Sequence, residues 1–187
     1  MDLASLFNPQ NRRLIKLTTP TLEFQELLLE NLNGTEGLSL LFNFTLSMLS
    51  QDPALELKTL IGKPACLEIE LADGGARHVH GYITQFGSSG SQDNLTHYSA
   101  TLTPWLWMLG KRFNSRIFQN QSVEQVISSV FANYTPLAQY EFRLLGDLPS
   151  RSYITQYRES DLNFVLRLLE SEGLFFYFEH SADQHTL

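Results

Sequence analysis

The sequence has 187 residues, of which 43% are apolar and 18% are charged, a composition typical of a globular protein. Its 13 basic and 20 acidic residues give a net charge of −7 with no basic block, which argues against a nucleic-acid partner and against binding to an anionic membrane. The sequence contains no apolar run near the ~20 residues that span a bilayer and no signal-peptide pattern at its start, so we expect synthesis in the cytoplasm without a cleaved signal and no stable membrane insertion. The single cysteine excludes an intrachain disulfide and fits folding in a reducing compartment.

The first half of the chain has the pattern of antiparallel strands. Apolar and polar residues alternate from Leu40 to Leu49, which predicts a half-buried strand. Asp73-Gly74 predicts a tight hairpin turn between two further strands. The remaining predicted elements are a short helical turn at 55–61, strands at 65–71, 77–86 and 95–103, and a polar loop at 87–94. This succession predicts a small barrel or sandwich.

The composition changes near Pro104-Trp105, and we place a domain boundary near residue 108, which gives modules at 1–108 and 109–187. The second module is expected to contain a helix near 122–133, because Ser122 with Gln125 three residues later is a capping-box pattern. The apolar stripe of this helix is Val123, Val126, Ile127, Val130 and Phe131. Strands are expected near 116–119, 140–145 and 152–157.

The segment from Gln156 to His180 predicts a capped helix followed by an apolar strand. Ser160 is a natural N-cap, Asp161 places a negative charge in the first turn, and Gly173 stands where a C′ glycine ends a helix near 160–172. Its predicted stripe is Leu162, Val165, Leu166 and Leu169, while Phe164 and Leu168 lie off it, so we expect packing against two neighbours. The run from Leu174 to Phe178 does not alternate, which predicts a strand covered on both faces and suggests a part made for assembly.

Several residues could in principle form a metal site. His78 and His80 share one face of a predicted strand, and His97 could join them from the next strand as a zinc ligand. We favour the interpretation that His78 and His80 are polar residues on an exposed face, because spacing fixes no third ligand. We interpret His180 and His185, on either side of a polar turn, as solvated.

Catalytic and ligand-binding patterns are weak. The pairs Glu68 with Glu70 and Glu170 with Glu172 could suggest acid–base catalysis, but residues two apart on a helix diverge by roughly 200°. The run at 87–91 is not a nucleophile elbow, and no phosphate loop or dinucleotide motif is present. Trp105 and Trp107 could stack on a ligand, but we favour a core role. The sequence therefore predicts no enzyme, cofactor or metal.

The step Arg158-Glu159-Ser160-Asp161 leaves two alternatives open. Arg158 could form a bidentate pair with a nearby carboxylate and hold the strand-to-helix junction, which we favour. Alternatively, Arg158 could be held for a neighbouring subunit.

A set of motifs in order along the chain resembles the VgrG family, the trimeric spike of the bacterial type VI secretion system. These motifs extend the resemblance from about Leu14 to Leu187. They are the run 157–162, Leu168-Leu169-Glu170, Glu172-Gly173 and the aromatic segment into Glu179-His180, with 36–39, 60–65, 80–84, 102–107 and 115–119 before them.

The resemblance implies a mainly β, α+β fold with two small antiparallel barrel-like modules of the phage tail hub type, the second one incomplete. It implies a homotrimer of pseudo-sixfold symmetry that connects the threefold spike to the hexameric Hcp tube. Baseplate and effector proteins would be further partners, and sheath contraction would eject the spike from the cell. Candidate assembly or junction residues are Arg158, Glu159, Asp161, Phe164, Leu168 and Phe176.

Two alternatives remain open. The chain could instead be the hub of a contractile phage tail or of a phage-tail-like bacteriocin. From another class, it could be a small β-barrel hydrolase or a carbohydrate-binding module, which would need a pocket with converging polar groups.

Overall fold

The structure, a computed structural model, describes residues 14–19 and 27–187. The described residues form two compact units. Unit 1 contains the described residues up to Glu36, together with Phe42–Pro104 and His180–His185. Unit 2 contains Gly37–Leu41, Trp105–Glu179 and Thr186–Leu187. The segment His180–His185 belongs to the second predicted module, whereas the structure groups it with the first unit. The predicted boundary near 108 stays a prediction.

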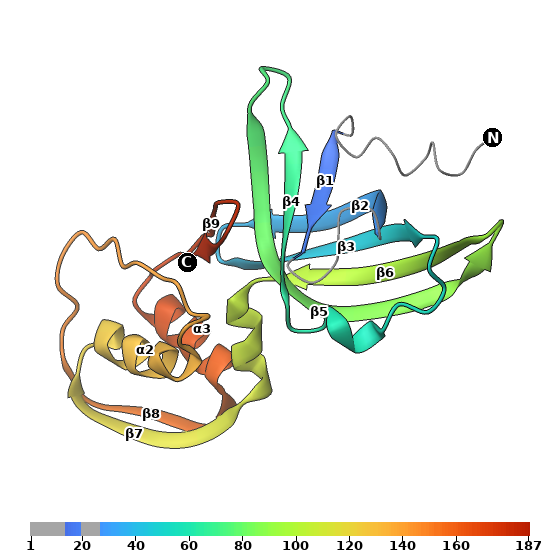
Figure 1. The fold of residues 1–187 in the computed structure, drawn as a ribbon. Coiled ribbons are helices and arrows are strands. Elements are labelled where there is room, and N and C mark those ends of the chain that lie inside the picture. Colours follow the sequence, from blue (N-terminus) through green and yellow to red (C-terminus); the bar gives the residue numbers. More distant parts are fainter. Residues whose placement is uncertain (1–13, 20–26) are drawn as a thin grey trace. The chain divides into compact units, whose positions relative to one another are not determined.

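Unit 1 is built on a curled antiparallel sheet of the half-barrel type, in which the long strand β5 curves through the sheet (Figure 1). The strand order is β1-β4-β5-β6-β3-β2. The strands are β1 (Ile15–Thr18), β2 (Leu28–Gly37), β3 (Leu40–Ser50), β4 (Pro64–Glu70), β5 (Ala76–Gln92) and β6 (Leu95–Thr103), and the short 3-10 helix η2 (Leu57–Thr59) lies between β3 and β4.

Alternation along the strands produces the core of unit 1. In β3, Phe42, Phe44, Leu46 and Met48 are buried, and β3 pairs with β6 in the register Leu46↔Ala100. The predicted hairpin is confirmed, because the Leu71 N–H donates to the Gly75 carbonyl at 2.8 Å and Gly74 has φ +82°. A left-handed residue at this position favours glycine.

One predicted loop is mostly strand instead. The segment 87–94 continues β5 as far as Gln92, which pairs with Leu95 of β6. Only Asp93 and Asn94 form the turn, with φ values of +52° and +63°. Positive φ at both central residues matches the twist of a two-residue hairpin, and Asp and Asn tolerate this conformation. Cross-strand pairing therefore overrides a composition rich in Gly and Ser.

Unit 2 contains a two-stranded ribbon and two α-helices, with short 3-10 turns between them. The elements are η3 (Trp105–Lys111), β7 (Phe113–Gln121), α2 (Val123–Phe131), η4 (Ala132–Tyr134), β8 (Arg151–Ser160) and α3 (Asp161–Ser171). Strands β7 and β8 pair antiparallel, and α2 and α3 lie along one side of this ribbon (Figure 1). Trp105 belongs to the core, where its ring meets Phe131 edge-on at 4.9 Å between centroids. The predicted mainly β, α+β class is confirmed.

The ends of both helices agree with the sequence. The Gln125 backbone N–H donates to Ser122 Oγ while the Ser122 N–H donates to Gln125 Oε1, and all five predicted stripe residues of α2 are buried. The Asn163 N–H donates to Ser160 Oγ at the start of α3, and Gly173 follows its end with φ +68°. The buried face of α3 is shifted from the predicted stripe, because Phe164, Val165, Leu168 and Leu169 are buried whereas Leu162 and Leu166 are half-buried.

Ser122→Ala is expected to lower the free energy of unfolding of unit 2 by about 1 kcal/mol, because it leaves the first turn of α2 without its side-chain cap. Urea unfolding followed by the fluorescence of Trp105 and Trp107, both in unit 2, measures this change. The matched control is Ser128→Ala, inside the same helix. An equal loss for both variants would contradict a capping role.

Two predicted strands of the second module are absent. The segments 140–145 and 174–178 are not assigned as strands. Phe176 is buried, but Phe175 and Tyr177 on either side of it are exposed, so this run is not covered on both faces as predicted. An extended segment becomes a strand only when another backbone pairs with it, and the apolar composition alone did not reveal whether such a partner was present.

A short hairpin follows, formed by β9 (Glu179–His180) and β10 (His185–Thr186). Among the helices that the structure describes, none has the length and hydropathy needed to cross a bilayer.

Candidate assembly site at the strand–helix junction

The β7–β8 ribbon of unit 2 leads directly into α3, and an irregular register marks the junction. The pairing shifts between Asn114 and Arg116, where Ser115 of β7 lies opposite two residues of β8, Tyr157 and Arg158. The Ser115 Oγ accepts a hydrogen bond from the Arg158 backbone N–H at 3.1 Å. Arg158 has φ +49°, a left-handed conformation that non-glycine residues rarely adopt. The Asp161 N–H then donates to the Arg112 carbonyl at 2.9 Å, which attaches the first turn of α3 to the start of the ribbon.

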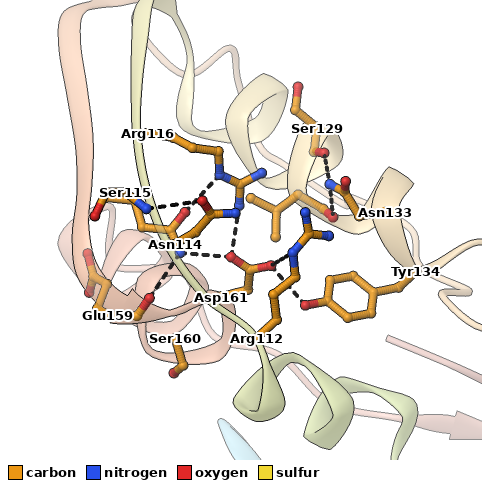
Figure 2. A network of polar contacts seen from close by, with 12 residues as sticks. Arg112, Asn114, Ser115, Arg116, Ser129, Asn133, Tyr134, Glu159, Ser160 and Asp161 are labelled. Atoms are coloured by element: carbon orange, nitrogen blue, oxygen red, sulfur yellow. Dashed lines mark hydrogen bonds and ion pairs between the residues drawn. The ribbon is translucent and has the colours of Figure 1, made fainter.

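Asp161 is the centre of a buried polar network (Figure 2). Arg116 Nη2 and Gln156 Nε2 both donate to Asp161 Oδ1 at 2.8 Å, and Tyr134 Oη donates to Oδ2 at 2.8 Å. Arg112 Nε lies 3.9 Å from Oδ2, and Arg116 Nε also donates to Gln156 Oε1 at 3.0 Å. Each carboxylate oxygen is thus satisfied, as a buried charge requires.

The electrostatics of this network favour a structural role. The Asp161 side chain is fully buried, whereas the Arg116 side chain is 24% exposed. Burial, followed by the hydrogen bond to the carboxylate, raises the pKa of the Tyr134 hydroxyl far above its ordinary value. A neutral tyrosine and a fully occupied carboxylate leave neither group available as a general base, so the network holds strand, turn and helix together.

The structure corrects the preferred interpretation of Arg158. Its side chain is exposed, with the guanidinium carbon 5.4 Å from the centre of the Tyr157 ring, and Arg112 and Arg116 are the residues that pair with Asp161. Glu159 pairs instead with Arg167, whose Nε donates to it at 3.3 Å. Arg116 stands 45 residues before Asp161, so local spacing offered no signal for this pair.

The other candidate assembly residues lie inside unit 2. Phe164 and Leu168 are at most 1% exposed, so they pack within the unit and cannot contact another chain without unfolding. Phe164 stacks on Phe118 of β7, with 5.8 Å between the ring centroids. Phe176 is also buried and lines the groove described below. These side chains therefore stabilise unit 2 from within, and other residues form its exposed surfaces.

The side of the ribbon that faces away from α3 carries large exposed side chains. Ile117 lies opposite Thr155, and Gln119 lies opposite Tyr153. Tyr157 follows two residues after Thr155 on the same face. The side chains of Ile117, Tyr153 and Tyr157 are 65–66% exposed. We call the set Ile117, Gln119, Tyr153, Thr155 and Tyr157 the ribbon outer face. Tyr153, Thr155 and Tyr157, which have high β-propensity and stand at every second position, were the signal that could have located it.

Unit 2 also contains an apolar groove with a volume of about 490 Å³. It is lined by Ile127 and Phe131 of α2 and by residues of the segments 140–148 and 173–177. Its charged residues are already paired, because Arg143 donates to Glu179 at 2.7 Å and to Glu141 at 2.9 Å. These carboxylates raise the pKa of Arg143, so the lining offers mainly apolar contact.

The sequence-predicted catalytic and metal candidates do not converge. Glu68 accepts a hydrogen bond from Lys16 at 2.9 Å, which lowers the pKa of Glu68, and Glu172 pairs with Arg151. His78 lies 3.9 Å from Glu68, whereas His97 lies 3.8 Å from Glu30 on β2. Across residues 14–19 and 27–187, no three His, Cys, Asp or Glu side chains are arranged to hold a metal ion.

Three histidines are less exposed than predicted. His80 is 4% exposed and His185 is 2% exposed, while His180 is half-buried. The interpretation of His80 as an outward polar residue and of His180 and His185 as solvated is therefore wrong. The turn 181–184 folds back so that both flanking imidazoles meet the Phe42 ring, at 5.0 and 5.5 Å between centroids. This contact joins residues far apart in the sequence.

A model of the phage tail baseplate hub family (GPD) matches residues 35–187. The chain belongs to this family. Curated relatives include the type VI secretion system spike protein VgrG1b of Pseudomonas aeruginosa PAO1, which is 37% identical over 95% of this chain and 24% of its own length. The actin cross-linking toxin VgrG1 of Vibrio cholerae is 33% identical over 89% of this chain and 16% of its own length. The resemblance to VgrG proteins is thus confirmed. This chain spans about a quarter or less of the length of these two relatives.

Solved structures agree with the hub family fold. The Escherichia coli protein c3393, described as a component of the type VI secretion system with structural similarity to the T4 tail proteins gp27 and gp5, aligns with a TM-score of 0.82 and 26% identity. The alignment covers 91% of this chain and 48% of that one. A Francisella PdpA-VgrG complex aligns with a TM-score of 0.66 and 12% identity, over 92% of this chain and 30% of that chain, which shows the common fold alone.

Proposed function

We propose that this chain is the hub region of a type VI secretion spike, in which three copies form a ring of pseudo-sixfold symmetry that sits on the hexameric Hcp tube. The observation that carries this proposal is the 37% identity to spike proteins along 95% of the chain. The role is mechanical and not enzymatic. The spike is made in the cytoplasm, engages baseplate and effector proteins, and is ejected by sheath contraction.

The surface features of unit 2 support a role in assembly. The ribbon outer face places Ile117, Tyr153 and Tyr157 in solvent, and aromatic residues on a rigid support are typical anchors of protein interfaces. The Asp161 network and the buried Phe164 fix the ribbon on α3, so the face needs little ordering when it binds. The exposed Arg158 beside Tyr157 is available to a carboxylate of a neighbouring copy, the second alternative for this residue.

The double variant Ile117→Asp/Tyr153→Asp is expected to abolish assembly of the spike and secretion of the tube protein. Two buried, unpaired carboxylates at an interface would weaken binding by more than about 100-fold, because each costs several kcal/mol to desolvate. Both positions are exposed within the chain, so its own stability should change by less than about 0.5 kcal/mol each.

The experiment introduces the double variant into the spike gene of a secreting bacterium. Tube protein in the culture supernatant and spike oligomers after mild cross-linking are then measured. Leu71→Asp, at an exposed apolar position in the β4–β5 turn, is the matched control. Normal secretion and normal oligomers in the double variant would refute the assembly role of the ribbon outer face.

A second candidate, the hub of a contractile phage tail or bacteriocin, is favoured by the phage tail baseplate hub model that matches the chain. Affinity purification from the producing cell distinguishes the two. The type VI spike should bring down the Hcp tube protein, whereas a phage or bacteriocin hub should bring down phage tail proteins.

The apolar, charge-paired groove gives less support to a hydrolase or carbohydrate-binding module, for which added oligosaccharides should raise the melting temperature.

A further inference from the structure

His80, His180 and His185 of unit 1 form a single cluster where the segment His180–His185 packs on the sheet. His80 Nδ1 lies 2.9 Å from His185 Nδ1, and His180 Nδ1 lies 3.1 Å from both the backbone nitrogen and the backbone oxygen of His80. The ring centroids of His185 are 5.2 Å from His80 and 5.9 Å from His180. Two residues of the C-terminal hairpin are thus bonded to one residue of β5.

The contact between His80 and His185 requires a particular protonation state. A hydrogen bond between two Nδ1 atoms exists only when one nitrogen carries a proton and the other presents a lone pair. If both rings are protonated, two N–H groups point at each other and two positive charges lie within one buried cluster. As long as only one of the two Nδ1 atoms carries a proton, a donor and a lone pair stay in place, so the contact opens when both rings are protonated.

The groups that the structure describes around the cluster are aromatic rings and a few charged side chains. Aromatic rings of Phe42 and Tyr82 pack against His185. The charged and titratable groups around the cluster are Asp183 in the turn, Glu36 and Arg77 near His180, and the Cys66 thiol on β4. Asp183 is exposed, and Glu36 is already paired with Arg77.

We propose that His80, His180 and His185 form a proton-operated latch, which holds the segment 180–185 on the sheet at neutral pH and releases it in acid. This device is independent of the assembly role proposed above. Release would expose the surface of β3 and β5 that carries Phe42, His80 and Tyr82. The rest of unit 1 would remain folded, because its strands pair with one another without this segment.

The direction of the pH effect follows from proton linkage. Burial lowers the pKa of His80 to about 4 and that of His185 to about 3, and it also lowers the pKa of His180. Released imidazoles return towards the ordinary value of 6.5, so the open state binds more protons than the closed state below that pH. Closure is complete at neutral pH and is lost as the pH falls from about 6.5 towards about 4.

Cys66 provides a built-in reporter of the latch. It is the only cysteine of the chain, it lies directly opposite His80 in the β4–β5 register, and its Sγ atom is 4.0 Å from the Ser181 carbonyl oxygen. The thiol is 7% exposed, so a reagent reaches it only after the covering segment moves. The accessibility of Cys66 therefore measures the open fraction.

The test measures labelling of Cys66 by 4,4′-dithiodipyridine between pH 7 and pH 4.5, with each rate divided by the rate of the urea-unfolded chain at the same pH. The ratio should rise at least about 50-fold from pH 6.5 to pH 4.5, the effect of one histidine that stays neutral when closed and has its ordinary pKa when released. Circular dichroism at each pH monitors the sheet. A flat ratio, or a rise that coincides with global unfolding, would overturn the proposal.

Variants assign the effect to the cluster. His185→Phe keeps an aromatic ring without a titrating group. The Cys66 labelling ratio of this variant should therefore rise less steeply as the pH falls, by up to tenfold less per pH unit than in the wild type. His78→Gln, on the same strand outside the cluster, is the matched control and should keep the wild-type profile. If His185→Phe does not fold, His180→Gln replaces it, with the same flattening expected. A wild-type slope in the cluster variant would refute the latch.

Discussion

Replacement of Asp161 by alanine is expected to lower the free energy of unfolding of unit 2 by about 3 kcal/mol. The reason is that Arg112, Arg116, Tyr134 and Gln156 all direct donors at this carboxylate, and its loss leaves a partly buried guanidinium without its charge partner. The lower end of the usual range of about 3–5 kcal/mol applies, because the Arg116 side chain keeps 24% exposure and can be partly hydrated.

Urea unfolding followed by tryptophan fluorescence measures this change, since both tryptophans belong to unit 2. Glu170→Ala is the matched control, because it removes an exposed carboxylate from the same helix. It should change the free energy of unfolding by less than about 0.5 kcal/mol. Similar losses for the two variants would show that the network at the start of α3 contributes no more than a surface charge.

Replacement of Phe164 by alanine is expected to cost about 4 kcal/mol in the same measurement. The side chain is fully buried and stacks on Phe118, so its removal leaves a cavity between α3 and the ribbon. The ribbon outer face is supported by this packing, and we expect its assembly to weaken together with the fold.

Phe175→Ala is the matched control for this second variant, because the Phe175 ring is 67% exposed in the same unit. A loss below about 0.5 kcal/mol is expected for it. If Phe164→Ala left the stability unchanged but abolished oligomers, Phe164 would be an interface residue, as the sequence first suggested, and the assignment to the core would be wrong.

Local signals predicted the parts of the fold that depend on local chemistry. The capping box of Ser122, the N-cap of Ser160 and the glycine after α3 are each decided within a few residues, and the structure confirms them. Strict alternation likewise located β3 and its buried face. In each of these cases the physical cause lies within one turn or one strand, so one sequence suffices.

Non-local contacts account for the sequence-based predictions that were wrong. The segment 87–92 is strand because β6 pairs with it, and the run 174–178 is not strand because the described chain supplies no ladder for it. Asp161 finds its partners in Arg112 and Arg116 across the ribbon, not in the adjacent Arg158. The burial of His80 and His185 depends on a turn that returns to the sheet about 100 residues later. Periodicity contains no information about such pairings.

The most direct test of the assembly proposal is native mass spectrometry of the spike protein purified, with its partners, from the bacterium that makes it. The proposed hub role predicts complexes with three copies of the spike chain and six copies of the tube protein. The ribbon variant Ile117→Asp/Tyr153→Asp should yield single chains. A wild-type spike that is monomeric and free of tube protein would contradict the proposed function.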